Sequence, residues 1–504
     1  MISSTLSRSL RRAAAVLFVL CAAAVFLYRI AGLQVRLRGW TPTSALPADS
    51  DDSLAVQGDQ IGTYAAELGR TYATELGRKF RPAAAQRHER RVHLLVPANR
   101  ANSRLCRTVA SAIVNDYPAP VIINWGLEQG DEAMNGYDMV TGKNWGVLEY
   151  LRELPATADD DIVIMVDAHD VIFQLPLQVL LGRYDDINAQ ATARLEKQHG
   201  REGLRADRIG QTIIMPSEKY CWPLDHRHPS CYAVPESGLR PDAYGPETDR
   251  ATETNRPRWL NSGVIMGPVG DMRELYEWAH VLWRAYDTQG GDQDYFSHIY
   301  GVQELSRQRL RGSQDWAFGF GEHFKDDELW RPHMEARHRD YRLGLDLGST
   351  AFQALNSAAG DLSAVVHGNA TAVDARDREH GTADIYGAPF AFPDDLRGPL
   401  PAGFRARAPD DGAGPPGWRD VRLFSNFHAR SVPALLHFNG DKTHMDDWWH
   451  RQWWAGQGRE MLQLRSSRPG FAIRPDNRSA HSVSMSWDDL CAPFEADVFV
   501  EPYD

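Results

Sequence analysis

The chain of 504 residues has a formal net charge of -12, with 43% hydrophobic and 24% charged residues. These values suit a globular protein with room for more than one domain, and they exclude collagen-like and wholly disordered chains. The net negative charge argues against nucleic-acid binding. The sequence also contains no zinc-finger cysteine spacing and no basic stripe interleaved with aromatic residues, which supports the same conclusion.

Residues 1–30 predict a short cytoplasmic tail and a signal anchor. The uncharged run Ala13–Tyr28 is short for a plasma-membrane span, but thinner early secretory membranes accept shorter helices. A cleaved signal peptide, and hence secretion, is the alternative, although no clear cleavage site follows the run. Arginines flank the run on both sides, so the positive-inside rule does not decide its orientation. The short tail and the possible cysteine pairing instead indicate a type II membrane protein of the Golgi or endoplasmic reticulum with a lumenal head.

Residues 31–90 predict a stem, because they are polar and rich in Pro and Ala. Four cysteines lie outside the hydrophobic segment, an even number that allows disulfides in an oxidising compartment. Cys221 and Cys231 are near enough in sequence to close one loop, and free buried thiols are the alternative. Asn-x-Ser/Thr triplets at Asn369 and Asn477 are weak support for a glycoprotein on the secretory route.

The globular part, residues 91–460, begins with alternating strands and helices. Strands are expected over Arg91–Pro97, Pro120–Trp125 and Ile162–Val166, and helices near Arg104–Asn115 and Thr141–Leu154. This alternation predicts an α/β, Rossmann-like fold with a mostly parallel sheet and helices on both faces. No Walker loop and no strand-linked GxGxxG is present, so phosphates would be held mainly by a cation and side chains.

The strand Ile162–Val166 ends abruptly in Asp167-Ala168-His169-Asp170. Its continuous apolar run is typical of a strand buried on both faces, where carboxylates do not belong. The aspartates therefore belong at its carboxyl end, where α/β sheets place ligands. Paired carboxylates there suit Mg²⁺ or Mn²⁺ and a phosphorylated substrate. The alternative is that Asp167 caps a turn and Asp170 points to solvent.

The later elements are less regular. Ile187–Gly210 is highly charged and predicts an exposed helix or insertion, and Gln211–Met215 predicts a strand. Leu260–Gly267 predicts a strand that contains a small polar turn. A helix is expected over Asp271–Tyr286, with Asp271 as its N-cap, and a further helical run over Tyr295–Tyr300.

Ala372–Arg419 is rich in Pro, Gly, Asp and Arg and predicts a long surface insertion, with disorder as one interpretation. Ala434–Trp454 predicts a strand and a helix that carries four tryptophans. Their helical spacing favours core packing over a sugar platform. Residues 461–504 are interpreted as a C-terminal extension.

Six short segments form a further pattern in the region from about Val92 to Lys442. They are the Asp167–Asp170 motif, Ser217–Pro223, Leu260–Gly263, Asp292–Gln293 with its following aromatics, Leu345–Asn356 and His437–Lys442. Together and in this order they resemble the glycosyltransferase domain of the procollagen lysyl hydroxylase/glycosyltransferase family, which has a GT-A nucleotide-sugar fold. The last segment has one residue fewer before its lysine than the family pattern.

The resemblance implies that Asp167 and Asp170 bind Mn²⁺, or Mg²⁺, and that His437 completes the site. Two carboxylates and one imidazole suit Mn²⁺ and leave positions for diphosphate oxygens. The cation would act as a Lewis acid on the departing nucleoside diphosphate. A satisfied core histidine is the alternative for His437. His367, in a more literal His-Gly-Asn triplet, comes too early in the motif order.

The resemblance also implies donor-binding roles for a set of residues, with the lysines at the phosphates and Val96 near the uridine: Val96, Lys143, Asp167, Asn261 and Lys442. Asp292 is the candidate catalytic base or sugar-orienting group, and Asp294 is the second candidate. Capping of the helix that follows is the alternative for Asp292. Glu218 is interpreted as structural.

The expected function is therefore transfer of a hexose, glucose or galactose, from a UDP-sugar to a hydroxyl of a glycan or glycoprotein. No iron-oxygenase motif is present, so lysine hydroxylation and a collagen acceptor are not implied. A non-catalytic nucleotide-sugar- or glycan-binding relative is the alternative. A metal-dependent phosphoester hydrolase is disfavoured, because ligands for a second metal are scarce.

Overall fold

The computed structural model describes residues 90–223, 228–285, 290–312, 340–404, 417–476, 478 and 483–499. These residues fall within the compact unit Gln86–Asp504. The predicted anchor, the stem and the Asn477 triplet lie outside the described residues and stay predictions. In the part of the chain that is described, no helix has the length and apolar character needed to cross a membrane.

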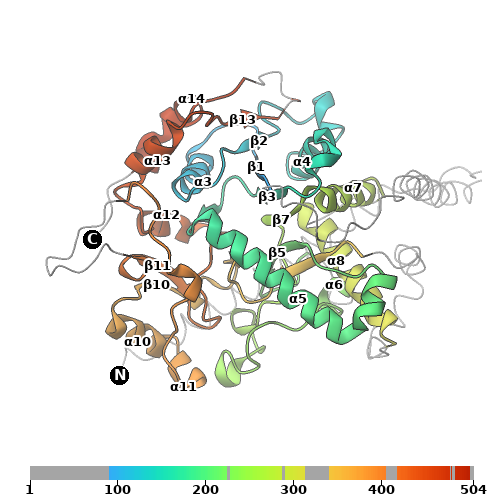
Figure 1. The fold of residues 1–504 in the computed structure, drawn as a ribbon, viewed down its shortest axis with the longest axis vertical. Helices are drawn as coiled ribbons and strands as arrows, with labels where there is room; N and C mark the ends of the chain where they lie inside the picture. The colour runs from blue at the N-terminus through green and yellow to red at the C-terminus, as the bar shows by residue number, and fades with distance from the viewer. Residues whose placement is uncertain are drawn as a thin grey trace, which may run out of the picture. The chain divides into compact units, whose positions relative to one another are not determined.

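The predicted alternation of strands and helices is confirmed (Figure 1). It consists of β1 (Val92–Pro97), α3 (Ser103–Val114), β2 (Val121–Ile123), α4 (Gly142–Glu153) and β3 (Ile162–Val166). β1 lies between β2 and β3 and runs parallel to both. These elements build the first half of an α/β sheet.

The second half of the sheet contains antiparallel pairs. β7 (Val264–Pro268) runs antiparallel to both β3 and β5 (Ile213–Glu218), and β8 (Leu343–Asp346) runs parallel to β5. β6 (Trp259–Leu260) pairs with β5, and β13 (Arg474–Pro475) pairs in parallel with β2 at the opposite edge. The strand order is β13-β2-β1-β3-β7-β5-β6, with β8 beside β5. The α/β class with a mostly parallel central sheet is confirmed.

The central strand β3 is buried on both faces, as predicted. All five of its residues are at most 1% exposed. Ile164 and Val166 pack in the core layer that includes α3, whereas Val163 and Met165 pack in the layer of α4, α7 (Val269–Ala285) and α8 (Asp292–Leu310). Burying each such side chain stabilises the fold by roughly 1.5 to 3 kcal/mol. A strand this constrained holds its carboxyl end in a fixed place.

Three predicted boundaries are wrong. Leu260–Gly267 is not one strand, because its polar turn separates β6 from β7. Asp271 is not an N-cap, because α7 begins at Val269 and the Asp271 carboxylate accepts a hydrogen bond from Thr212 Oγ1 at 2.6 Å. The helical run expected from Tyr295 is α8, which begins three residues earlier at Asp292.

The charged stretch predicted as an exposed helix or insertion belongs to one long helix, α5 (Leu177–Ala206), with a kink at Gly200. Leu180 and Tyr184 join the hydrophobic core. Arg183 is buried and pairs with Asp395 at 2.6 Å. The amino-terminal half of the helix is therefore packed against the core. The predicted segment, which began at Ile187, did not include these anchoring residues.

A second, three-stranded sheet positions the site. Its order is β4 (Val171–Phe173), β12 (Leu435–His437) and β9 (Phe352–Ala354), with β12 antiparallel to β4 and parallel to β9. Because β4 follows β3 after only four residues, β12 is brought to the carboxyl end of β3.

Over the described residues, the predicted insertion Ala372–Arg419 is not disordered. It contains most of α10 (Ala370–Glu379) and α11 (Thr382–Tyr386), which lie near the antiparallel pair of β10 (Leu362–Val366) and β11 (Arg422–Asn426) (Figure 1). Phe390, Leu396 and Trp418 are buried in the main core. A high content of Pro, Gly and charge concealed these apolar anchors.

The C-terminal residues complete the same core. α12 (Thr443–His450), α13 (Gly458–Ser466), α14 (Trp487–Cys491) and α15 (Glu495–Val498) follow β12, and the four tryptophans of Ala434–Trp454 are buried as predicted. A disulfide between Cys106 and Cys491 ties α14 to α3. Of the two possibilities left open for Cys221 and Cys231, a disulfide and free thiols, the structure has the disulfide, next to the short helix α6 (Pro229–Tyr232).

Candidate metal centre

The three predicted metal ligands meet at the ends of three strands. Asp167 follows β3, Asp170 precedes β4, and His437 ends β12. The Asp167 N–H donates to the Gly263 carbonyl at 2.8 Å, and the Phe438 N–H donates to the Asp170 carbonyl at 2.8 Å. The backbone itself therefore fixes where the three side chains start.

The distances from His437 to the two carboxylates match those between ligands of one cation. His437 Nε2 is 3.6 Å from Asp167 Oδ2 and 3.6 Å from Asp170 Oδ1, and one ligand atom from each residue lies within 4.8 Å of the others. Two ligands bound at about 2.1 Å from one ion lie roughly 3 to 4 Å apart. Asp170 is 6% exposed, so the alternative that it points to solvent is wrong.

His437 is oriented through its other ring nitrogen. Nδ1 lies 2.8 Å from Asn261 Oδ1, which also accepts the Gly263 N–H at 3.1 Å. The amide oxygen can only accept, so Nδ1 carries a proton and Nε2 faces the two carboxylates. A histidine held this way by a second partner is typical of metal ligands.

Gly263, at the end of the Leu-Asn-Ser-Gly segment, has no room for a side chain. A Cβ on Gly263 would lie 2.0 Å from His437 Cε1. The imidazole therefore packs directly against the backbone of the turn between β6 and β7. This contact explains why the Leu-Asn-Ser-Gly segment needs glycine at its end.

A buried carboxylate holds Asn261 in this orientation. Glu218 is 3% exposed and accepts hydrogen bonds from Gln293 Nε2 at 2.7 Å, Asn439 Nδ2 at 2.8 Å and Asn261 Nδ2 at 3.4 Å. Burial raises the pKa of Glu218 to about 7, although its hydrogen-bond donors and His437 oppose that rise. Glu218 thus has a positioning role that the sequence interpretation, which left it structural, did not identify.

Two lysines pair with the carboxylates of the cluster and offset part of their negative charge. Lys143 Nζ, at the start of α4, lies 2.5 Å from Asp167 Oδ1 and 3.0 Å from Asp292 Oδ2. Lys442 pairs with Asp170 Oδ2. The predicted residues Lys143, Lys442 and Asp292 therefore do gather at the metal ligands.

The protonation equilibria of the cluster follow from burial and these charges. Burial opposes ionisation of Asp170, but His437 and Lys442 outweigh it and lower its pKa. Burial raises the pKa of Asp167, with Lys143 opposing. Burial lowers the pKa of His437, yet Asp170 and Asp167 outweigh it and the net pKa is raised. The imidazole therefore holds its second proton more tightly than usual, in competition with a metal.

The remaining predicted residues lie differently. Asp294 is buried two residues after Asp292, about 200° further around α8, so the two carboxylates do not face the same side. The Val96 side chain is fully buried in the hydrophobic core, so only the backbone of this residue could contact a nucleotide-sugar donor. His367 lies outside the cluster and bonds to Ser425 Oγ at 2.8 Å, as its early position in the motif order predicted.

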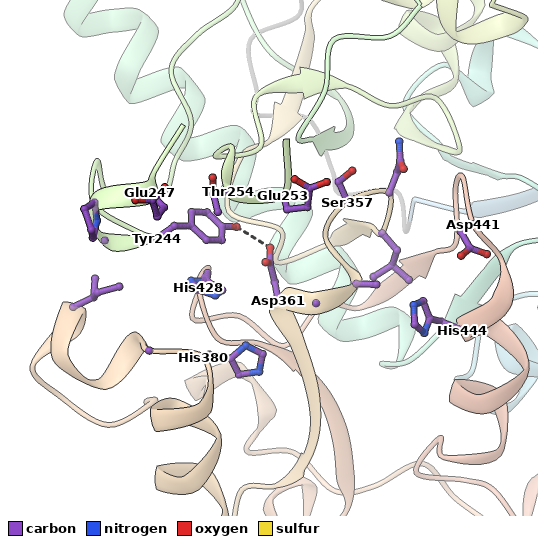
Figure 2. A pocket seen from close by; sticks show the side chains of 18 of the residues that line it. Tyr244, Glu247, Glu253, Thr254, Ser357, Asp361, His380, His428, Asp441 and His444 are labelled. Atoms are coloured by element: carbon purple, nitrogen blue, oxygen red, sulfur yellow. Dashed lines mark hydrogen bonds between the residues drawn. The ribbon is translucent and has the colours of Figure 1, made fainter. Parts of the chain in front are cut away.

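A cleft of about 740 Å³ lies beside the segment that carries His437 (Figure 2). Phe438 and Asp441 line it, next to His437 and Lys442 in the chain. Its other lining residues come from four further segments, around Tyr244, Asp361, His380 and His428. Sequence analysis did not identify this cleft, because no local motif links segments so far apart.

No protein-family model matches the chain, and no curated protein matches it. The chemistry of the site therefore has to be argued from its own residues.

Proposed function

We propose that the protein is a metal-dependent glycosyltransferase with a GT-A-like fold that moves a hexose from a UDP-sugar to a hydroxyl of a glycan or glycoprotein. The observation that carries the proposal is the meeting of Asp167, Asp170 and His437 at the carboxyl end of β3. That end of an α/β sheet is where phosphorylated ligands bind. The ordered similarity of six segments to a glycosyltransferase domain supports the same assignment.

The charges of the site favour a diphosphate only when a cation is present. When the His437 imidazole is neutral, Asp167, Asp170 and Asp292 outnumber Lys143 and Lys442, so the metal-free cluster would repel a diphosphate. A divalent cation on the three ligands reverses that balance. It would also release Lys442 from Asp170 and Lys143 from Asp167, so that both ammonium groups can turn to phosphate oxygens, while Lys143 keeps its pairing with Asp292.

The donor set fits such a cation. Two carboxylates and one imidazole suit Mn²⁺, and Mg²⁺ less well, with coordination positions left for phosphate oxygens. When bound, the cation would supply Lewis-acid stabilisation of the leaving diphosphate. Asn261, held by Glu218, keeps His437 Nδ1 protonated and Nε2 available. Asp292, beside Lys143, is the group we assign to the sugar or to the acceptor proton.

The proposed compartment is the lumen of the Golgi or endoplasmic reticulum, with the chain anchored by Ala13–Tyr28 as a type II membrane protein. Disulfides between Cys106 and Cys491 and between Cys221 and Cys231 support this proposal, because disulfides persist in oxidising compartments.

The test is hydrolysis and transfer of UDP-sugars by the full chain, with Mn²⁺ and with EDTA, across several donors. We expect Mn²⁺-dependent turnover that Asp170→Asn and His437→Gln both abolish. Asp374→Asn is the matched control, because Asp374 is exposed on α10 and outside the cluster. Absence of turnover with every donor, together with UDP binding that survives, would identify a non-catalytic binding protein instead.

A further inference from the structure

The cleft of Figure 2, which we call the Tyr244 cleft, shares a wall with the metal centre. Leu355 and Asn356 line it, and their N–H groups donate to Asn439 Oδ1 at 2.9 and 3.0 Å. The same Asn439 amide donates to Glu218, which positions Asn261 and, through it, His437. One wall of the cleft is therefore built on the network that orients a metal ligand.

The floor of the cleft is a compact polar cluster. Asp361 accepts a hydrogen bond from the Tyr244 hydroxyl at 2.7 Å (Figure 2). It also pairs with Lys219 Nζ at 2.8 Å. Lys219 is 1% exposed and lies 4.5 Å from the centre of the Tyr244 ring. His428 stacks on the same ring at 4.2 Å. The charge of Asp361 is therefore compensated inside the protein and is not available to a ligand.

The rest of the lining combines apolar walls with neutral polar groups and carboxylates. Leu355, Ile385 and Phe438 supply apolar surface, and Asn356, Ser357 and Thr254 supply neutral donors and acceptors, whereas no lysine or arginine occurs among the described lining residues. Glu247, Glu253 and Asp441 add negative charge, which Arg250 partly offsets at Glu247, 3.6 Å away. His380, His428 and His444 also line the cleft, and burial lowers the pKa of His380 and of His428, so an anionic ligand would meet mainly like charge here.

We propose that the Tyr244 cleft binds the acceptor of the transfer and that this acceptor is an uncharged glycan. The assignment rests on the proposed function. Its volume lies in the range of ligand pockets, and apolar walls with scattered hydrogen-bonding groups suit sugar rings, which present both C–H faces and hydroxyls. Carboxylates such as Glu253 are strong acceptors for hydroxyl donors. The donor site, which becomes positive when a divalent cation is bound, and the negative acceptor site then select different substrates of the reaction.

The experiment measures binding to the full chain, with Mn²⁺ and UDP present, of three oligosaccharide panels of matched size. One panel is uncharged, one carries uronic acids, and one consists of chitosan fragments with free amines. We expect saturable binding within the uncharged panel and at least tenfold weaker binding of uronic-acid members. Preference for either charged panel, or binding of none of the three, overturns the proposal.

A blocking variant locates the binding. A Cβ on Gly360 meets no atom within 4 Å, and Gly360 lines the cleft, so Gly360→Trp adds bulk there without a backbone clash. Gly398→Trp is the matched control, since Gly398 is equally unobstructed and is not among the cleft residues. We expect Gly360→Trp to weaken binding of the best uncharged glycan at least tenfold and Gly398→Trp to leave it unchanged. Equal affinities of the two variants contradict the assignment.

Donor hydrolysis by the wild-type chain separates the two proposals. If no UDP-sugar is hydrolysed with Mn²⁺, the proposed function fails. If hydrolysis occurs and no glycan panel binds, the assignment of the Tyr244 cleft fails alone.

Discussion

The metal centre and the Tyr244 cleft differ in both charge and construction. The candidate metal centre gathers two carboxylates and an imidazole at strand ends, with Lys143, Asp292 and Lys442 at the starts of helices. The cleft has no described lysine or arginine in its lining and keeps its one buried lysine under the floor. Ligands of α/β sheets bind at the carboxyl ends of strands, so a short motif at a strand end can mark such a site. The cleft needs five segments, so its composition follows from the tertiary fold and not from any motif.

The largest expected effect is loss of a metal ligand. Asp170→Asn removes one carboxylate charge and a ligand while keeping the side-chain volume, so we expect turnover of the UDP-sugar to fall about 1000-fold, equivalent to roughly 4 kcal/mol of transition-state stabilisation. Initial rates over a Mn²⁺ titration measure it. A fall of less than tenfold at saturating Mn²⁺ would remove Asp170 from the ligand set.

The next effect is on pH dependence. Burial lowers the pKa of His437, but Asp170 and Asp167 outweigh it and leave the net pKa raised, so below that pKa a proton occupies Nε2 and competes with the cation. Mn²⁺ affinity should therefore rise as the pH rises, by up to about tenfold per unit while the imidazole titrates. Calorimetry at several pH values, in buffers of different ionisation enthalpy, would also detect the released proton. A Mn²⁺ affinity that does not depend on pH, with no proton released, contradicts competition between a proton and the cation for His437 Nε2.

The third effect tests the support of the histidine. Asn261→Ala removes the acceptor of the His437 Nδ1–H, and loss of such a partner lowers metal affinity by about 10- to 100-fold. Mn²⁺ binding followed by electron paramagnetic resonance measures the change. Ser262→Ala is the neighbouring control. The Ser262 N–H donates to Gln293 Oε1, and the substitution keeps this hydrogen bond. Equal affinities of the two variants would mean that Asn261 does not orient the ligand.

The smallest effect belongs to the floor of the cleft. Tyr244→Phe removes the hydroxyl that donates to Asp361, and losing one hydrogen bond to a buried charged group costs about 1.5 to 3 kcal/mol of unfolding free energy. Urea unfolding measures this loss, and Mn²⁺ affinity of the same variant should change less than twofold. A Mn²⁺ affinity that falls as much as in Asn261→Ala would show that the two regions are one coupled unit.

Sequence reasoning identified the three residues of the candidate metal centre because each of them belongs to a local signal. Asp167 and Asp170 interrupt apolar strands, and His437 follows the buried pair Leu435 and Leu436. Burial on both faces made β3 recognisable, and the helices and strands near it followed from periodicity. The pairing of Lys143 with Asp292 was not predicted, because Lys143 was expected at the phosphates and Asp292 at the sugar or the acceptor.

The rest depended on contacts between distant segments. Glu218 was left structural because its partners, Gln293 and Asn439, are far away in sequence. Asp271 at the expected N-cap position bonds instead to Thr212, on a different element. The insertion Ala372–Arg419 was expected to lie on the surface because its few apolar residues are outnumbered, yet those residues are the ones that the core buries. Tertiary packing thus overrode local composition.

Calorimetric titration of UDP into the full chain, with and without Mn²⁺, tests the central claim most directly. Since the metal-free cluster carries excess negative charge and its lysines are paired with carboxylates, we predict UDP binding only when Mn²⁺ is present and its loss in Asp170→Asn. Equal UDP affinity with and without Mn²⁺, or Mn²⁺ binding that Asp170→Asn leaves unchanged, would contradict a metal centre that recruits the diphosphate.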